Sequence, residues 1–167
     1  LSKIDAFIFD FDGVLTNNLV HLDQDGKETV SCNRADGLAF DVLRKLKKSS
    51  YIISTEKNSV VTARANKLKI TALQGVGDKV KQIKKLALKE CFDLQNILYV
   101  GNDLNDYRVM KLCGYTACPS DSHEEIRGFA TVILKTKGGN GIVRELLEDV
   151  FKLNFIVDCV IKLPKSN

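Results

Sequence analysis

Short apolar runs that alternate with segments of helical periodicity constrain the fold of this chain more than any other feature. The runs have the length and the β-branched or aromatic content of buried strands. They are AFIF (6–9), YIIS (51–54), ILYV (97–100) and TVIL (131–134). Between and after them, apolar residues recur on one helical face, as in residues 38–46, 80–87 and 142–150. This alternation predicts an α/β fold: a Rossmann-like parallel sheet with helices on both faces.

One segment interrupts the alternation directly after the first strand. Residues 17–33, NNLVHLDQDGKETVSCN, predict two strands joined by a turn at Asp23 to Gly26, because Asp and Gly are common turn formers. We therefore expect a β-hairpin insertion after strand 1. Residues 1–154 are expected to form a single capless domain. Residues 155–167 are apolar and then basic, and we expect them to be a C-terminal extension that packs on a neighbouring subunit.

The composition is that of a globular protein, with 167 residues, 44% hydrophobic and 28% charged. The chain contains no apolar run long enough for a membrane span and no secretory signal. Five scattered cysteines without a Cys-x-x-Cys pair predict reduced thiols and a cytoplasmic protein. The net charge of +4 favours an anionic substrate and is weak support for nucleic acid. The chain starts at Leu1 rather than Met, as expected of a trimmed chain or one cut from a longer protein.

Polar side chains follow the predicted strands at the points where these end. Asp10 and Asp12 follow the first strand and would point the same way if it continued. Two carboxylates held this close repel each other unless a cation or a proton relieves the repulsion. The second strand ends at Ser54 and Thr55, and the third runs into GNDLND (101–106). Because α/β sheets bind ligands at the carboxyl ends of their strands, these side chains predict one site.

The residue types at this edge suit a metal and a phosphoryl group. Carboxylates are ligands that Mg²⁺ prefers. A further stretch, GVGDKV (75–80), places Lys79 at the start of a helix. A hydroxyl, an ammonium group and the free N–H groups of a helix start are suitable partners for a phosphoryl group.

The four stretches DFDGVLT, the Ser after YII, the isolated Lys79 and GNDLND resemble, in this order, the motifs of the haloacid dehalogenase-like superfamily in its phosphatase branch. The resemblance spans residues 6 to about 153. The lack of a large insertion resembles the capless subfamily that acts on the 8- or 9-phosphates of 3-deoxy-2-keto sugar acids. NRADG (33–37) and KGGNGIVRE (137–145) also resemble that subfamily. The resemblance implies substrate contacts from residues of the first stretch, namely Asn33, Arg34, Asp36 and Gly37.

The resemblance implies a Mg²⁺-dependent phosphoric monoester hydrolase and a role for each motif residue. Asp10 is expected to attack phosphorus and form an aspartyl phosphate, and Asp12 to act as general acid and then general base. Mg²⁺ would bridge Asp10 and a phosphoryl oxygen, with the Asp12 carbonyl as a further ligand. Ser54 and Lys79 would hold the other phosphoryl oxygens, and Asp106 would orient Lys79.

One position departs from the usual pattern, in which Asp follows the glycine of the last motif. Here Gly101 is followed by Asn102 and then Asp103. An amide oxygen can bind Mg²⁺ but brings no charge. Either Asn102 binds the metal directly, which we favour, or Asp103 takes part, for example through water.

The choice of sugar acid depends on the residue two positions after Ser54. The octulosonate 8-phosphate enzymes tend to have Arg there, whereas this chain has Glu56, next to Thr55. Lys67 is expected to supply the lost positive charge for the substrate carboxylate. This combination resembles the branch acting on the 9-phosphates of nonulosonates, such as deaminoneuraminate or N-acetylneuraminate, which we expect as substrate. The octulosonate 8-phosphate is the alternative.

The resemblance also implies an assembly. In similar proteins the hairpin of one subunit leans over the site of its neighbour in a tetramer, so we expect a homotetramer in which residues 17–33 contact the neighbouring site. An alternative of another class is a non-catalytic oligomerisation domain, because similar domains are fused to cytidylyltransferases that activate sialic acids. The presence of Asp10, Asp12, Ser54 and Lys79 argues against lost activity.

Overall fold

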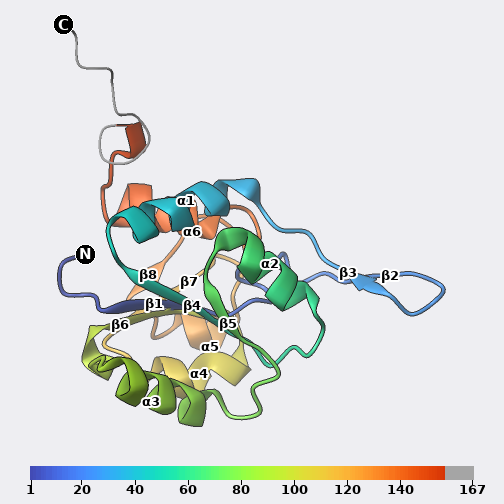
Figure 1. Ribbon diagram of the computed structural model, residues 1–167, viewed down its shortest axis with the longest axis horizontal. Helices are drawn as coiled ribbons and strands as arrows, with labels where there is room; N and C mark the ends of the chain where they lie inside the picture. The colour runs from blue at the N-terminus through green and yellow to red at the C-terminus, as the bar shows by residue number, and fades with distance from the viewer. Residues whose placement is uncertain (157–167) are drawn as a thin grey trace, which may run out of the picture.

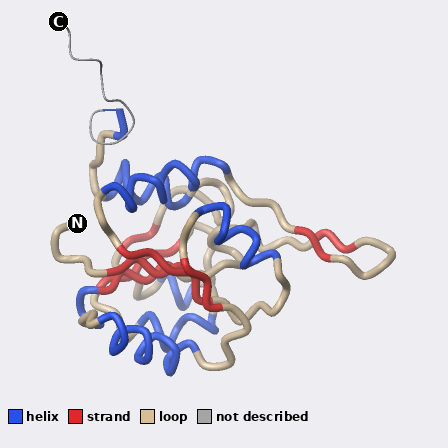
Figure 2. Tube along the Cα trace, viewed as in Figure 1, coloured by secondary structure: helices blue, strands red, loops and turns tan. Residues whose placement is uncertain are grey.

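A six-stranded parallel sheet forms the centre of the computed structural model, which describes residues 1–156 (Figures 1 and 2). Its strand order is β5-β4-β1-β6-β7-β8, so the predicted fold class is confirmed. The strands are β1 (Ala6–Phe9), β4 (Ser49–Ile53), β5 (Thr71–Leu73), β6 (Ile97–Val100), β7 (Tyr115–Cys118) and β8 (Val132–Ile133). Most of the expected C-terminal extension, residues 157–167, lies outside the described residues.

Helices cover both faces of the sheet (Figure 1). One face carries α1 (Arg34–Lys45), α2 (Val60–Leu68) and α6 (Ile142–Glu145), which continues into a π-helical turn at Leu146–Val150. The other face carries α3 (Lys79–Glu90), α4 (Leu104–Met110) and α5 (Glu124–Arg127), and a 3₁₀ turn at Leu94–Asn96 precedes β6.

The central strand β1 sends alternate side chains into two separate cores. Phe7 and Phe9 belong to the core under α1, α2 and α6, whereas Ala6 and Ile8 belong to the core on the other face. All four side chains are fully buried. This explains why the sequence shows a continuous apolar run here rather than an alternating pattern.

The sequence predicted β1 and β6 with their observed bounds but missed two outer strands, β5 and β7. Their sequences, TAL and YTAC, are short and contain threonine, so they lack the apolar run used as the signal. Their strand conformation depends on pairing with neighbours, β5 with β4 and β7 with β6.

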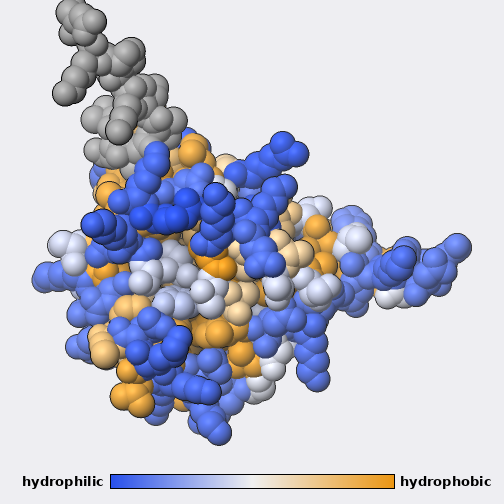
Figure 3. Space-filling view, in the orientation of Figure 1, coloured by the Kyte–Doolittle hydropathy of each residue, from blue (hydrophilic) through white to orange (hydrophobic). Residues whose placement is uncertain are grey.

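The predicted hairpin is present and projects from the body of the domain (Figures 1 and 2). Its strands are shorter than expected: β2 (His21–Leu22) pairs antiparallel with β3 (Glu28–Thr29). Asp23 Oδ1 stabilises the turn by accepting hydrogen bonds from two backbone N–H groups within it. In the space-filling view the tip of the hairpin is mainly hydrophilic (Figure 3). Within residues 1–156, no helix has the length and apolar character needed to cross a membrane.

Candidate active site

The strand-end carboxylates lie together at the carboxyl edge of the sheet. The backbone N–H of Asp10 donates to Val100 O of the neighbouring strand (2.9 Å), and the chain then turns back on itself through Thr16. Asp10 is 4% exposed, and its Oδ1 accepts a hydrogen bond from the N–H of Phe11 (2.8 Å). Both carboxylates face a small pocket of about 70 Å³. It is lined by Asp10, Asp12, Asn18, Thr55, Asn102, Asp103 and Asn105.

Lys79 lies in the first turn of α3 and forms an ion pair with Asp10 of this pocket. Asp78 caps the helix by accepting from Lys81 N (3.0 Å), so Lys79 is its first residue. The ammonium group is buried and lies 2.9 Å from Asp10 Oδ1 and 2.7 Å from Asp106 Oδ1. The predicted meeting of Asp10, Lys79 and Asp106 is therefore present in the structure.

Asp106 connects three elements of the site. Its Oδ1 accepts from Lys79 Nζ and from the hydroxyl of Tyr99 (3.0 Å), and its Oδ2 accepts from the N–H of Asn102 (3.0 Å). Tyr99 is fully buried in β6 and was not predicted as a site residue. The sequence does contain a feature that could have identified Tyr99, namely the one hydroxyl group within the apolar run ILYV. A buried tyrosine hydroxyl usually needs a hydrogen-bond partner.

Burial and neighbouring charges together set the pKa values of Asp10 and Lys79. It raises the pKa of Asp10 well above its usual range, and Asp106 raises it further, whereas Lys79 opposes both effects. Burial alone would lower the pKa of Lys79, but the two carboxylates outweigh it and raise that pKa. The charged form of Lys79 is therefore favoured, and its positive charge partly offsets the burial that disfavours the Asp10 carboxylate.

Asp12 is held by the turn that follows it. Burial raises the pKa of Asp12 and the nearby carboxylate of Glu56 raises it further, while the hydroxyl of Thr16 opposes both. Thr16 Oγ1 lies 3.5 Å from Asp12 Oδ1 and accepts from the N–H of Gly13 (3.2 Å). Thr16 is a second positioning residue that the sequence did not single out. A raised pKa suits Asp12 to proton transfer near neutral pH.

The pocket offers a cation an amide ligand as well as carboxylates. Asn102 Oδ1 is buried and has no hydrogen-bond partner within residues 1–156, which fits a metal ligand. Asp103 is exposed, and its Oδ1 caps α4 by accepting from Leu104 N (2.7 Å). Within the described part of the chain, no cluster of three or more His, Cys, Asp or Glu side chains has metal-binding geometry. Mg²⁺ can be bound by few protein carboxylates together with amide, carbonyl and water oxygens. Asp10, Asn102, a backbone carbonyl and water would provide such a set of ligands.

The segment after β4 contributes one wall of the pocket. Ser54 is buried and its Oγ accepts from the N–H of Glu56 (3.1 Å), while Thr55 lines the pocket. Glu56 Oε1 accepts from the N–H groups of Lys57 (2.6 Å) and Asn58 (2.7 Å). Glu56 therefore shapes the loop that leads to α2 and lies close enough to Asp12 to influence its pKa.

Several predicted substrate contacts lie in a second hollow, between α1 and α2. This hollow of about 360 Å³ shares no lining residue with the pocket of Asp10. It is lined by Arg34, Gly37, Leu38, Asp41, Arg64, Lys67 and Leu68. Lys67 lies in the last turn of α2 and lines this hollow rather than the pocket of Asp10, so its expected contact with the substrate carboxylate stays a prediction.

Two residues of NRADG have structural partners instead of facing the pocket. Asn33 caps α1, because its Oδ1 accepts from Ala35 N (2.8 Å), and its carbonyl oxygen accepts from Arg64 Nη2 (2.7 Å). Asp36 is 1% exposed, and its Oδ1 accepts from the N–H of Val143 at the start of α6 (2.9 Å). The expectation that Asp36 contacts substrate is not supported, because its carboxylate is enclosed between two helices.

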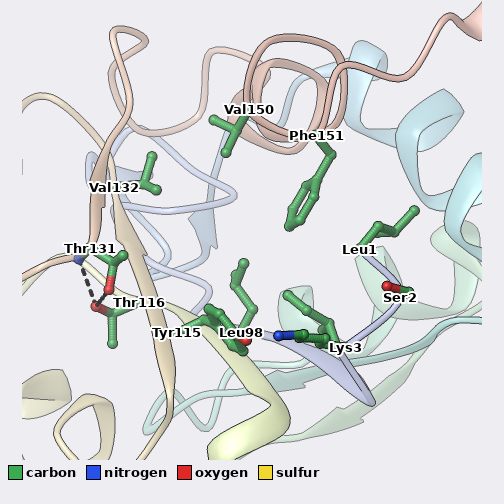
Figure 4. Close-up of a pocket in the computed structure, with 11 residues that line it drawn as sticks. Leu1, Ser2, Lys3, Leu98, Tyr115, Thr116, Thr131, Val132, Val150 and Phe151 are labelled. Atoms are coloured by element: carbon green, nitrogen blue, oxygen red, sulfur yellow. Dashed lines mark hydrogen bonds between the residues drawn. The ribbon is translucent and has the colours of Figure 1, made fainter.

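A larger apolar cavity of about 260 Å³ lies at the opposite, amino edge of the sheet (Figure 4). Leu98, Val132, Val150 and Phe151 line it together with residues 1–4, and no acidic side chain takes part. It has none of the chemistry described above, so the smaller polar pocket is the candidate active site.

Comparison with known proteins shows the family to which the chain belongs. A family model of haloacid dehalogenase-like hydrolases matches residues 38–146. The chain belongs to this family. The chain is 32% identical over 149 residues to the 3-deoxy-D-manno-octulosonate 8-phosphate phosphatase of Yersinia pestis. The match covers 88% of this chain and 79% of that relative. The Escherichia coli K12 phosphatase of the same name is also 32% identical, over 147 residues, covering 87% of this chain and 78% of that relative.

Solved structures of haloacid dehalogenase-like hydrolases have the same fold. The 3-deoxy-D-manno-octulosonate 8-phosphate phosphatase of Moraxella catarrhalis, in complex with magnesium, phosphate and KDO, superposes with a TM-score of 0.85 at 30% identity, covering 90% of this chain and 87% of that one. A Streptomyces avermitilis protein assigned to the HAD family of hydrolases gives 0.86 at 40% identity, covering 88% and 84%. The predicted family and the predicted enzyme class, a phosphoric monoester hydrolase, are confirmed.

Proposed function

We propose that this protein hydrolyses the phosphate monoester of a 3-deoxy-2-keto sugar acid, with the 8-phosphate of 3-deoxy-D-manno-octulosonate as the first candidate. The observation that carries the proposal is the pocket in which Asp10 and Asp12 lie beside the buried Lys79. The curated relatives and the Moraxella catarrhalis structure support the octulosonate ester. This order of candidates reverses the one expected from Glu56 alone.

We assign two chemical steps to these residues. Asp10 attacks phosphorus as the nucleophile, an oxygen–phosphorus bond forms, and the ester bond breaks as Asp12 gives its proton to the leaving alkoxide. Asp12 then takes a proton from water, which attacks the aspartyl phosphate and releases phosphate from Asp10. Lys79, held by Asp106, and Ser54 balance charge on the phosphoryl oxygens.

Mg²⁺ is the cofactor we assign to this pocket. Asp10, the Asp12 carbonyl and Asn102 Oδ1 would hold it, with Asp103 in a supporting position through water. When bound, it neutralises charge on the carboxylates and polarises the phosphoryl group.

A nonulosonate 9-phosphate is a second candidate, favoured by Glu56. Its Oε1 accepts hydrogen bonds from the N–H groups of Lys57 and Asn58 in the loop before α2. A carboxylate at this place repels a substrate carboxylate and accepts hydrogen bonds from hydroxyl or amide groups. A Glu56→Arg variant should shift kcat/KM toward the octulosonate ester, and Glu56→Gln, which keeps the acceptor, serves as the matched control.

The deciding experiment measures kcat/KM for both esters with Mg²⁺ and with a chelator. The proposal expects Mg²⁺-dependent release of phosphate, a preference for the octulosonate ester, and loss of turnover in Asp10→Asn. A preference for a nonulosonate ester would select the second candidate. Activity that survives in Asp10→Asn would contradict the mechanism. A purified protein that releases no phosphate from either ester would support the non-catalytic alternative.

We also propose that the hairpin completes the site of a neighbouring copy in a cytoplasmic homotetramer. Leu19, Val20 and Leu22 are 62%, 54% and 67% exposed on a hairpin that projects from the domain (Figure 3). Exposed apolar side chains on such a projection favour burial against another surface.

A further inference from the structure

The loop of residues 135–141, between β8 and α6, lies directly against the turn that carries Asp12, although the mechanism above does not use it. The N–H of Gly139 donates to Val14 O (3.0 Å). A Cβ added at Gly138 would overlap the carbonyl oxygen of Gly13, and one added at Gly139 would overlap the backbone of Thr16 and Asn17. Only glycine allows backbone to approach backbone this closely.

The contacted turn sets the position of Asp12. It starts at Asp12 itself and ends at Thr16, whose hydroxyl accepts from Gly13 N and lies 3.5 Å from Asp12 Oδ1. A second N–H, from Asn18, also donates to Thr16 Oγ1 (3.3 Å). A displacement of the turn by a few tenths of an ångström would therefore move the acid/base carboxylate relative to Asp10.

The carboxylates of Asp121 and Glu145 accept hydrogen bonds from the loop, and that of Asp36 accepts one from the helix that follows it. Asp121 Oδ1 accepts from Gly138 N (2.9 Å). Glu145 accepts from the N–H groups of residues 135 (2.7 Å) and 136 (2.8 Å). Asp36 of α1 accepts from Val143 N at the start of α6, just after the loop (2.9 Å). The loop is thus bonded to α6 and to the segment after β7, and α6 is bonded to α1, while Gly139 bonds the loop to the turn of Asp12.

We propose that residues 135–141 form a positioning element for the acid/base step, with Gly139 as its contact and Asp121 as a positioning residue that acts through Gly138. This proposal rests on the proposed function, because it assigns the loop to Asp12 of the same site. The hydrogen bonds of the loop lead to Val14 of the turn, to Asp121 and to Glu145, so we expect its effect to fall on proton transfer by Asp12 rather than on phosphate binding.

Aryl phosphate esters distinguish the general-acid role of Asp12 from its general-base role. Nitrophenolate leaves without a proton, so Asp10 can form the aspartyl phosphate from p-nitrophenyl phosphate while Asp12 is displaced. Hydrolysis of that intermediate still needs Asp12 to take a proton from water. A displaced Asp12 therefore predicts fast release of one nitrophenolate per site followed by slow turnover.

The experiment compares Gly139→Ala and Asp121→Ala with the wild type, each as the full chain with saturating Mg²⁺. We expect a nitrophenolate burst of about one per site and steady-state turnover slowed by about tenfold or more, with KM for the sugar ester nearly unchanged. Asp121→Asn keeps an acceptor for Gly138 N and should restore turnover. Gly128→Ala is the control, because an added Cβ there would lie 3.4 Å from its nearest contact.

Hydrogen exchange of the amides of residues 11–18 provides a readout independent of activity. Faster exchange in Asp121→Ala than in the wild type and in Asp121→Asn supports the proposal. Unchanged exchange and turnover in Asp121→Ala, or burst and turnover falling together, would overturn it. A wild-type enzyme without Mg²⁺-dependent hydrolysis would instead overturn the proposed function, while the exchange measurement would still decide whether the loop holds the turn.

Discussion

Lys79 Nζ lies 2.7 Å from Asp106 Oδ1 and also 2.9 Å from Asp10 Oδ1, so one buried ammonium group joins a supporting carboxylate to the candidate nucleophile. All three side chains are at most 5% exposed. Burial strengthens these interactions and makes the loss of any one partner costly.

Replacing Asp106 by Ala should destabilise the fold as well as stop turnover. The change leaves Lys79 with one carboxylate fewer and removes the acceptor of the Tyr99 hydroxyl and of Asn102 N. We expect a loss of about 3–5 kcal/mol in the free energy of unfolding, measured by urea denaturation. Tyr99→Phe removes one hydrogen bond from the same carboxylate and should cost only about 1 kcal/mol. Equal losses in the two variants would contradict this arrangement.

Asn102→Asp should strengthen Mg²⁺ binding, because it places a charged oxygen where the buried Oδ1 has no partner. The Mg²⁺ concentration for half-maximal activity should fall by about tenfold, equivalent to about 1.4 kcal/mol. Without metal, the added charge beside Asp10 should lower the melting temperature, so Mg²⁺ should raise Tm more in the variant than in the wild type. Asn105→Asp, also at the pocket, is the matched control. A variant that needs more Mg²⁺ would argue against direct binding by Asn102.

Asp36 should make stability fall as pH rises through the weakly acidic range. Burial raises the pKa of Asp36 to about 6, although the N–H groups of Val143 and Arg144 oppose it. Between the usual pKa of 3.8 and the raised pKa of about 6, the unfolded chain loses this proton before the folded one does, so rising pH favours unfolding. The shift of about two pKa units corresponds to about 3 kcal/mol.

Asp36→Asn should remove this contribution while keeping an acceptor for Val143 N. The free energy of unfolding of Asp36→Asn, relative to that of the wild type, should therefore increase between pH 4 and pH 7, as measured by urea titration at each pH. Asp149→Asn, an exposed carboxyl replaced in the same way, controls for the change in net charge. Parallel pH curves for the wild type and Asp36→Asn would exclude a protonated Asp36 in the folded state.

The hairpin prediction concerns assembly and activity together. Leu22→Asp places a charge on the projecting hairpin, and we expect it to convert the proposed tetramer to smaller species in sedimentation and to lower kcat/KM by about tenfold. Leu88, which is 83% exposed on α3, is the matched control, and Leu88→Asp should leave both measurements unchanged. A Leu22→Asp monomer with full activity would show that the site needs no neighbour.

The sequence alone predicted the candidate catalytic groups and the sheet edge on which they lie. Asp10, Ser54 and GNDLND each follow an apolar strand run, and parallel strands bring their carboxyl ends to one edge whatever the details of packing. Only tertiary structure decided which helix residues face that edge. Lys67 and Asp36 are near the motifs in the sequence, but Lys67 faces the hollow between α1 and α2, and Asp36 is enclosed against α6.

The same distinction separates the residues that perform the chemistry from those that hold them. Tyr99, Thr16 and the loop of residues 135–141 act through contacts between segments distant in sequence or through close turn geometry, which local patterns of polarity do not encode. A strand end limits where a carboxylate can lie, because backbone pairing fixes the register. The direction of a helical or loop side chain is set by the surfaces packed against it, and these exist only once the chain has folded.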